Sequence, residues 1–493
     1  MPDILNIGSH RELFWDDTLI DTHQTTSSLL LHHPERKPPC FLRDKPWEGK
    51  GQYDCLLFDG EKNRLYYEGG EGTCVIESAD GVRWERPDVG IFEFQGSKHN
   101  NIVWRSEDEG HDGFCVILDP RPECPPEEKF KALVRYFHGG LNGEFWIYTS
   151  PDGYRFKRGW LAVSQGAYGD SNNTISWDPE KKLFRLVLRG FHRSRRPDDP
   201  IIYRDIRVAE SEDCHTWTYP EELSYSTDTE FHMYINNIFN YPRAEQVLVG
   251  FPARLIARDR WTANYEELCG AERRRALMPT FPEGTKFDGF RLALGVTETL
   301  FMTSRNARDW TRYEEAFLTP GPENPHNWVY GDVYLARGLV RSPGLYPGED
   351  DCYSMYAFNK RFSGGYEDLE RWTIRLDGFV SRHAGAREER LVTKPFVFAG
   401  EKMLLNFATS TRGHVKLLLR TLDGEEMAET CELFGNACDR RVTFTKGTHA
   451  KKDYLADGFN EEREECSIAP MSGRPVVLEM RMQEADVYAM KFE

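Results

Sequence analysis

One short pattern occurs four times along the chain, as ESADGVRW (77–84), TSPDGYRF (149–156), ESEDCHTW (210–217) and TSRNARDW (303–310). In each copy a Ser precedes an aromatic residue by six positions, and an Asp or Asn lies between them. Turn-forming residues followed by an aromatic residue are typical of a tight turn that leads into a returning β-strand. Each copy therefore predicts a hairpin.

Alternating or apolar runs precede each copy, for example YDCLLFDG (53–60) followed by RLYYEGG (64–70). Each repeat unit is therefore expected to form a four-stranded antiparallel sheet. Repeated four-stranded sheets are the signature of a β-propeller, whose blades bury their apolar faces against one another. A fifth unit fits between residues 327 and 380, although it lacks the Ser-to-aromatic pattern. A large β-sandwich with similar hairpins is the alternative.

The character of the sequence changes after Asp377-Gly378. The last part carries alternating runs such as KMLLNFAT (402–409) and PVVLEMRM (475–482) without the repeat, which favours packed antiparallel sheets. The predicted fold class is therefore all-β, with a five-bladed β-propeller over residues 1–378 followed by a C-terminal β-sandwich over residues 379–493. The best helix candidate is residues 263–278.

Composition limits the kinds of partner. The 63 Lys and Arg residues and 80 Asp and Glu residues give a net charge of -17 over 493 residues. Such a charge argues against nucleic acid and against anionic membranes as partners. The amino terminus shows no secretory signal or membrane anchor, so a cytoplasmic location is expected. The oligomeric state stays open.

Several classes of site lack their sequence motifs. The 11 Cys residues are scattered without a CxxC pair, which is typical of reduced thiols. No HxxxH or HxH spacing joins the candidate histidines, so no metal is predicted; these histidines are His111, His138, His232 and His326. The absence of GxSxG, GxGxxG and GxxxxGK motifs disfavours serine hydrolysis and nucleotide chemistry. No cofactor is expected.

Polar residues gather where the innermost strand of each predicted blade begins. In a propeller these starts converge on the central channel, although they are dispersed in sequence. The candidate catalytic residues there are Asp54, Asp112, Asp170 and Glu230. The candidate substrate-binding residues are Asn172, Asn173, His232, Tyr234, Asn236, Trp328, Tyr330 and Asp332.

A pocket lined by carboxylates suits glycoside cleavage. One carboxylic acid protonates the leaving oxygen, and a second carboxylate attacks the anomeric carbon or activates water. Neighbouring acids also raise each other's pKa and so separate acid from base. Asp and Asn are ordinary turn formers as well, so a structural role is an equal alternative for any one of them.

These features together resemble the five-bladed β-propeller glycoside hydrolases, in particular families 32 and 43. Most narrowly the chain resembles a bacterial branch of that superfamily. Its pattern includes LFWDDTLI (13–20), LDPRPECPPEEKFKAL (118–133), TLFMTSRNARDW (299–310), LDGFVSRHAG (376–385) and LVTKPFVF (391–398). The strict family 32 motifs WMNDPNG, RDP and ECPD do not occur.

The resemblance implies roles for the acidic residues by position. Asp54 would be the base or nucleophile of the first blade, and Asp112 the orienting residue of the second. Asp170 stands where those families have a Glu as the general acid, and Glu230 competes with it. The implied substrate is a furanoside, fructosyl or arabinosyl, or a related small oligosaccharide, cleaved without a cofactor.

Two other functions remain open at this point. A glycoside phosphorylase would need a basic cradle for phosphate, for which Arg204, Arg207 and His232 are candidates. A propeller that only binds carbohydrate would use the channel acids as hydrogen-bond partners, because fold alone does not settle function.

Overall fold

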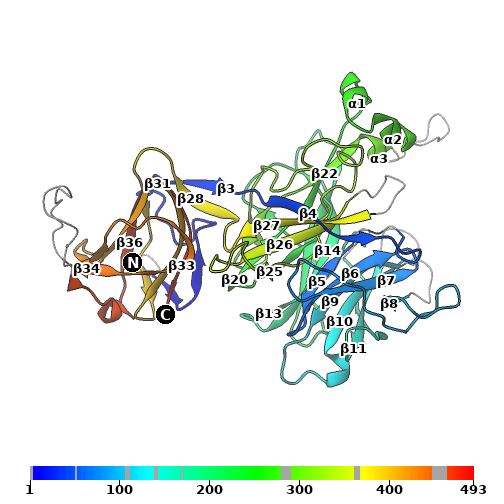
Figure 1. Ribbon diagram of the computed structural model, residues 1–493, viewed down its shortest axis with the longest axis horizontal. Helices are drawn as coiled ribbons and strands as arrows, with labels where there is room; N and C mark the ends of the chain where they lie inside the picture. Colours follow the sequence, from blue (N-terminus) through cyan, green and yellow to red (C-terminus); the bar gives the residue numbers. More distant parts are fainter. Residues whose placement is uncertain are drawn as a thin grey trace. The chain divides into compact units, whose positions relative to one another are not determined.

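The computed structural model describes residues 4–49, 51, 53–105, 111–137, 143–166, 168–169, 171–278, 290–359, 367–446 and 464–493. The chain forms two compact units (Figure 1). Unit 1 contains residues 1–32 and 375–493, and unit 2 contains residues 33–374. Strands dominate the described residues, which confirms the all-β prediction. The α-helices among them are short: α1 (Ala263–Glu267), α2 (Ala271–Ala276) and α3 (Phe290–Leu294).

Five sheets of four or five strands make up most of unit 2. The first has the order β5-β6-β7-β8, with bounds Cys55–Phe58, Asn63–Gly69, Gly72–Ser78 and Ile102–Trp104. The second has the order β9-β10-β11-β12, with bounds His111–Leu118, Phe130–Phe137, Gly143–Ser150 and Lys157–Val163. The third has the order β13-β14-β15-β16, with bounds Thr174–Asp178, Leu183–Arg193, Ile202–Ser211 and Glu221–Glu222.

The fourth and fifth sheets continue this arrangement. The fourth has the order β19-β20-β23-β24-β17, with bounds Ile238–Tyr241, Ala244–Gly250, Met302–Ser304, Asp309–Arg312 and Ser224–Tyr225. The fifth has the order β25-β26-β27-β4, with bounds Val340–Ser342, Cys352–Phe358, Glu367–Arg375 and Glu35–Arg43. A separate three-stranded sheet contains β18 (His232–Met233), β21 (Ala253–Ala257) and β22 (Gly295–Thr299).

The first strands of the five sheets, or the residues just before them, contact one another in sequence order, and the contacts return to β5. They are Cys55 Sγ to Cys115 Sγ at 3.5 Å, Cys115 Sγ to the Ile175 carbonyl at 4.0 Å, Thr174 Oγ1 to the Asn236 carbonyl at 2.9 Å, Asn237 Nδ2 to the Leu335 carbonyl, and a parallel bridge from Arg337 to Cys55. This circuit brings together segments from all five sheets.

Apolar clusters fill the spaces between neighbouring sheets. Successive residues of a strand point to opposite faces, so a strand covered on both sides must be apolar on both. In β10, Ala132 and Val134 pack with the first sheet, whereas Leu133 packs with the third. The sheets of unit 2 are therefore stabilised by burial of both faces.

The four sequence repeats form the same turn after the third strand of four sheets. The Ser hydroxyl oxygen accepts a hydrogen bond from the N–H three residues later, in Gly81 (2.8 Å), Gly153 (3.0 Å), Cys214 (2.9 Å) and Ala307 (3.0 Å). These residues have positive φ, between 65° and 76°. The final aromatic residues pack into the apolar clusters; they are Trp84, Phe156, Trp217 and Trp310.

The fifth sheet has no such turn because its fourth strand comes from elsewhere in the chain. Strand β4 (residues 35–43) pairs antiparallel with β27, and Glu367 lies opposite Arg43. The chain therefore does not need to turn back after β27 to form a fourth strand. This explains why the fifth unit lacks the Ser-to-aromatic pattern.

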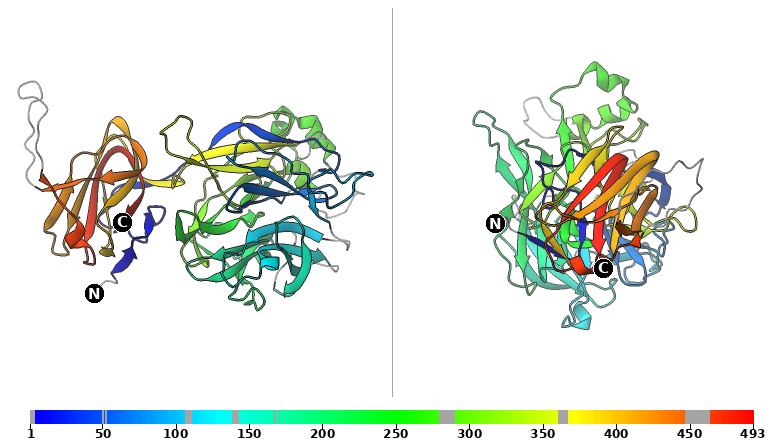
Figure 2. Two further views of the ribbon diagram at one scale, coloured as in Figure 1. Left: turned by 60° about the horizontal axis from the view of Figure 1, so that its bottom comes forward. Right: turned by 90° about the vertical axis from the view of Figure 1, so that its left-hand side faces the viewer.

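Unit 1 contains one ten-stranded sheet and a two-stranded parallel pair (Figure 2). Its strands are β2 (Arg11–Leu13), β3 (Ser28–Leu31), β28 (Val380–Ala384), β29 (Glu389–Val392), β31 (Met403–Arg420), β32 (Glu426–Thr430), β33 (Asn436–Val442), β34 (Phe444–Lys446), β35 (Glu464–Glu465) and β36 (Val477–Phe492). The parallel pair is β1 (Leu5–Gly8) with β30 (Phe396–Phe398). Buried side chains such as Phe407, Leu417 and Met480 form the core of unit 1.

Two expectations differ from this arrangement. The N-terminal residues were expected to belong to the first domain, but β1, β2 and β3 pair with β30, β36 and β28 of unit 1. The expected helix over 263–278 is divided, because Leu268 is extended and Gly270 has φ 79°.

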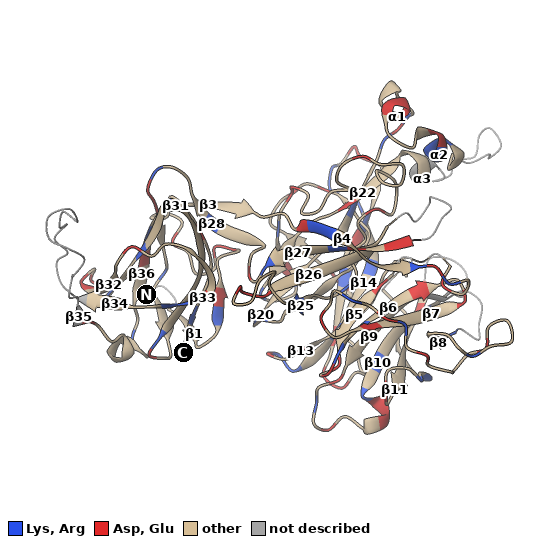
Figure 3. Ribbon diagram, in the orientation of Figure 1, with Lys and Arg blue, Asp and Glu red and all other residues tan. Residues whose placement is uncertain are grey.

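Charged residues of both signs are interspersed along the strands (Figure 3). None of the helices in the described ranges is long and apolar enough to cross a membrane.

Candidate functional site

Asp54 lies directly before β5, at the start of the first strand of the first sheet. Its side chain is buried, with the residue 3% exposed, and its carbonyl accepts a hydrogen bond from Arg337 N–H at 2.9 Å. The preceding Tyr53 packs against a cluster of tyrosines from the segments that precede β19 and β25. Asp54 therefore begins its strand beside residues that are far away in sequence.

This tyrosine cluster contains Tyr234, Tyr330 and Tyr334. The rings of Tyr234 and Tyr330 meet edge to face, with centroids 5.7 Å apart. Two of the candidate substrate-binding residues are thus in contact. Aromatic rings with a polar hydroxyl suit the mixed apolar and polar faces of a sugar.

Two arginines of the third sheet lie beside Tyr234. The guanidinium carbons of Arg189 and Arg204 are 5.1 and 4.9 Å from the centre of its ring. Arg189 also donates a hydrogen bond to the Tyr234 carbonyl at 2.6 Å. The start of the fourth sheet is thereby anchored to the third, and positive charge is placed next to the tyrosine cluster.

The predicted asparagines are buried just before two of the first strands, β13 and β19. Asn172 Nδ2 donates to Asn237 Oδ1 at 3.0 Å, and Asn173 Oδ1 accepts from Arg189 N–H at 2.9 Å. These two residues bind neighbouring parts of the protein. Asn236 differs, because it is fully buried and its Nδ2 and Oδ1 have no hydrogen-bond partner among the described residues. An unsatisfied buried amide is costly for the folded state.

Arg135 is a further residue near the candidate catalytic acids. It lies on β10 opposite Asp112 on β9, and it is 1% exposed. A Cβ atom built on Gly169 would overlap the Arg135 guanidinium, so Gly169 lets the two segments approach. The Asp112 side chain and the whole of Asp170 lie outside the described residues. Arg135 itself lies opposite Asp112 in the pairing of β9 with β10, and against Gly169, the residue before Asp170 in the sequence.

We expect Gly169→Ala to lower the free energy of unfolding by about 1–3 kcal/mol, because the added methyl group must displace a buried arginine. Urea denaturation followed by tryptophan fluorescence measures the effect. The control is Gly385→Ala in unit 1, where a Cβ meets no atom within 4 Å and little change is expected. Equal stability of the two variants would show that Arg135 moves aside freely.

Glu230 does not lie on an innermost strand, which corrects the sequence-based expectation. It precedes β18, and its carboxylate accepts hydrogen bonds from Ser194 Oγ at 2.7 Å, from Arg195 N–H at 3.1 Å and from His192 Nε2 at 3.1 Å. Burial opposes ionisation, but these hydrogen bonds lower the pKa of Glu230 below its ordinary value. Glu230 precedes β18 of the three-stranded sheet, whereas the first strand of the fourth sheet, β19, begins only at Ile238.

His192 lies between two carboxylates. Its Nδ1 is 3.0 Å from Asp205 Oδ2, and its Nε2 faces Glu230. The hydrogen bond with Asp205 raises the pKa of His192, against the effect of burial. The described residues offer one metal-type grouping here, of His192, Asp205 and Glu222, but guanidinium groups already contact its carboxylates: Arg195 is 3.1 Å from Glu222 and Arg207 is 3.7 Å from Asp205.

These pKa shifts predict how stability depends on pH. The raised pKa of His192 means that its charge stabilises the fold fully below the ordinary value of 6.5, and that this contribution is lost as pH rises through the folded-state pKa. The lowered pKa of Glu230 stabilises the fold above its ordinary 4.5 and is lost as pH falls. We expect urea midpoints of the parent, but not of His192→Gln, to fall as pH rises above 6.5. Parallel pH profiles would contradict this expectation.

Trp328, Tyr330 and Asp332 lie in a tight turn, whereas the sequence predicted the start of a strand. Positive φ at Trp328 (58°), Gly331 (92°) and Val333 (47°) excludes extended backbone at these three positions. Asp332 Oδ2 accepts a hydrogen bond from Val329 N–H at 2.9 Å. Burial raises the pKa of Asp332 to about 7. Asp332 thus holds the turn that presents Tyr330.

His232 lies on β18. Its Nδ1 accepts a hydrogen bond from Arg204 N–H at 3.3 Å, and its ring packs 4.9 Å from that of Tyr203. Arg207, the other phosphate candidate, donates to the Phe191 carbonyl at 3.0 Å. These residues link β14, β15 and β18 to one another.

No protein-family model matches the chain, and no curated protein does. Among solved structures the chain is similar to an N-acetylgalactosamine deacetylase from F. plautii in complex with blood group B trisaccharide, with 13% identity, a TM-score of 0.41, and coverage of 70% of this chain and 96% of that chain. It is also similar to a Bombyx mori family 32 β-fructofuranosidase, with 10% identity, a TM-score of 0.38 and coverage of 94% of both chains. A third is a family 43 arabinoxylan arabinofuranohydrolase from Bacillus subtilis, with 11% identity, a TM-score of 0.35, and coverage of 90% of this chain and 96% of that chain. Glycoside hydrolases of families 32 and 43 are thus among the solved structures to which the chain is similar.

Proposed function

We propose that unit 2 is a five-bladed β-propeller that acts as a glycoside hydrolase, and that unit 1 is a β-sandwich. The circuit of contacts through the first strands carries this proposal, because it brings segments from all five sheets together. The buried Asp54 begins one of these strands, beside tyrosines that begin or precede two others. Such a convergence of a carboxylate, aromatic rings and amides suits a saccharide site.

In this proposal Asp54 is the base or nucleophile. Its carboxylate either attacks the anomeric carbon or takes a proton from the attacking water, and the second carboxylic acid protonates the departing oxygen. Asp112 orients Asp54, and Asp170 supplies the acid. Arg135 lies opposite Asp112 and against Gly169, and a cation opposite Asp112 would favour the carboxylate form that an orienting residue needs.

Glu230 is less suited to be the acid. Its hydrogen bonds from Ser194, Arg195 and His192 stabilise the carboxylate form, and its pKa is lowered. A general acid needs its proton at the working pH, which requires a raised pKa. We therefore favour Asp170 over Glu230.

Substrate recognition is assigned to the neighbouring side chains. Tyr234 and Tyr330 would provide apolar surfaces for the sugar ring, and the unsatisfied amide of Asn236 would bind a hydroxyl. Trp328 donates its indole N–H to the Gly321 carbonyl at 2.8 Å, so it would contribute only its ring face. The proposed substrate remains a furanoside, fructosyl or arabinosyl, or a related small oligosaccharide.

A panel of nitrophenyl furanosides and pyranosides tests the activity, each assayed with and without inorganic phosphate. Release of nitrophenol without phosphate is expected. A strict requirement for phosphate would instead indicate a phosphorylase, for which Arg189 and Arg204 beside Tyr234 would bind the anion. Binding of an oligosaccharide by calorimetry, without cleavage of any glycoside, would reject catalysis.

A further inference from the structure

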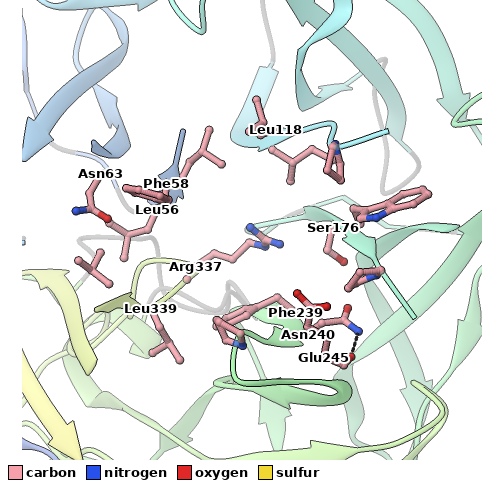
Figure 4. Close-up of a pocket in the computed structure, with 18 residues that line it drawn as sticks. Leu56, Phe58, Asn63, Leu118, Ser176, Phe239, Asn240, Glu245, Arg337 and Leu339 are labelled. Atoms are coloured by element: carbon pink, nitrogen blue, oxygen red, sulfur yellow. Dashed lines mark hydrogen bonds between the residues drawn. The ribbon is translucent and has the colours of Figure 1, made fainter. Parts of the chain in front are cut away.

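A cavity lies toward the other ends of the first strands, away from Asp54. Its volume is about 450 Å³, within the range of small-molecule sites, and residues from all five sheets line it (Figure 4). Leu56, Leu57 and Phe58 of β5 contribute to it, whereas Asp54 precedes that strand. The cavity is therefore distinct from the candidate catalytic site.

The walls of this cavity are mainly apolar and aromatic. Phe58 comes from the first sheet, Leu118 from the second, Trp177 from the third and Phe239 from the fourth. Leu339, directly before β25 of the fifth sheet, completes the wall opposite Leu118 (Figure 4). Rings and branched side chains on all sides suit a ligand with a flat apolar body.

Arg337 supplies the one cationic side chain among the residues that line the cavity. Its main chain is fixed by hydrogen bonds to Asp54 and Leu56, of 2.9 and 2.7 Å, and its side chain projects into the cavity (Figure 4). The residue is 8% exposed, and its Nε is buried without a hydrogen-bond partner. The guanidinium lies 5.5 Å from the ring of Phe239 and beside the Cys55 thiol.

The charge of Arg337 is not matched by a carboxylate. Among the described residues it forms no ion pair. A guanidinium keeps its charge at any ordinary pH, and burying it without an anion is costly. Glu245 also lines the cavity, so its carboxylate disfavours ligands with more than one negative charge.

We propose that this cavity binds a small organic monocarboxylate with an aromatic body, whose carboxylate pairs with Arg337. A guanidinium and a carboxylate form two parallel hydrogen bonds, which fixes the orientation of the ligand. The apolar walls then cover its ring. Inorganic dianions are disfavoured because apolar walls replace little of their hydration.

Calorimetric titration with benzoate at constant ionic strength tests the proposal, with benzamide as the uncharged isostere. We expect saturable binding of one benzoate. Benzamide should bind more weakly than benzoate by about tenfold or more. Arg337→Met should weaken benzoate binding by about tenfold or more. The control is Arg341→Met, which removes a 62% exposed arginine from the same segment and should leave the affinity unchanged.

Glu245→Gln provides a test that does not depend on weakened binding. Removing the negative charge beside the cavity should tighten benzoate binding by about twofold or more, without affecting benzamide. A gain of affinity cannot arise from misfolding. Equal affinity for benzoate and benzamide, no benzoate binding, or unchanged affinity in a folded Arg337→Met protein would each overturn the proposal. Glycosidase activity does not enter these measurements, so they fail or succeed independently of the proposed function.

Discussion

Asp54→Asn is expected to lower kcat/KM for the glycoside that the parent protein cleaves by about 10³-fold. The amide keeps the shape of the side chain but neither attacks the anomeric carbon nor accepts a proton from water. The loss should appear mainly in kcat, because the tyrosines and Asn236 that bind the sugar are unchanged. Steady-state release of nitrophenol measures it.

The matched control is Asp59→Asn, the same substitution just beyond the other end of β5. Asp59 lies 2.9 Å from Arg64 and caps the turn between β5 and β6. Its loss should reduce the free energy of unfolding by about 1 kcal/mol and leave kcat/KM near the parent value. If Asp54→Asn cleaved as fast as Asp59→Asn, Asp54 would have no catalytic role.

The repeat made the sheets of unit 2 predictable, because its spacing encodes a turn that local chemistry enforces. Ser78 and Asp80 accept the N–H groups of the residues that follow them, and Gly81 adopts the positive φ that the turn needs. Such hydrogen bonds involve neighbours in sequence. They can therefore be recognised without knowing the rest of the fold.

The division of the chain could not be predicted in this way. The N-terminal segment joins unit 1 through β2, where Arg11 lies opposite Lys491. Arg11 is also 3.1 Å from Asp377, which is buried. Pairing between residues hundreds of positions apart leaves no local pattern.

The candidate site was predictable only in part, for the same reason. Asn236 does lie in the circuit, because its carbonyl accepts the hydrogen bond from Thr174 Oγ1, whereas Tyr234 and Tyr330 lie in the segments that precede β19 and β25. Glu230 was misplaced because its partners His192 and Ser194 come from β14 and the residue just after it, nearly forty residues earlier. The turn at Trp328 gave one signal, Gly331, but a Trp and a Val with positive φ have no signature in sequence.

Arg43→Met is expected to cost about 3–5 kcal/mol of the free energy of unfolding. Arg43 Nη1 is 2.8 Å from Glu367 Oε2, and both side chains are almost fully buried. The Arg43 guanidinium also donates to the Glu48 and Glu68 carbonyls at 2.7 and 2.6 Å. The substitution would leave the Glu367 carboxylate buried without this cation, on the strand that β4 must pair with to complete the fifth sheet.

The control lies on the same two strands. Arg36 of β4 pairs with Glu370 of β27, but the Arg36 side chain is 40% exposed, so Arg36→Met should cost about 1 kcal/mol or less. Urea denaturation of both variants measures the difference. Adding Glu367→Gln to Arg43→Met should recover part of the loss, because the buried carboxylate that has lost the Arg43 cation becomes a neutral amide. Equal costs for the two arginines would mean that burial of the Arg43 pair contributes nothing to holding β4 in place.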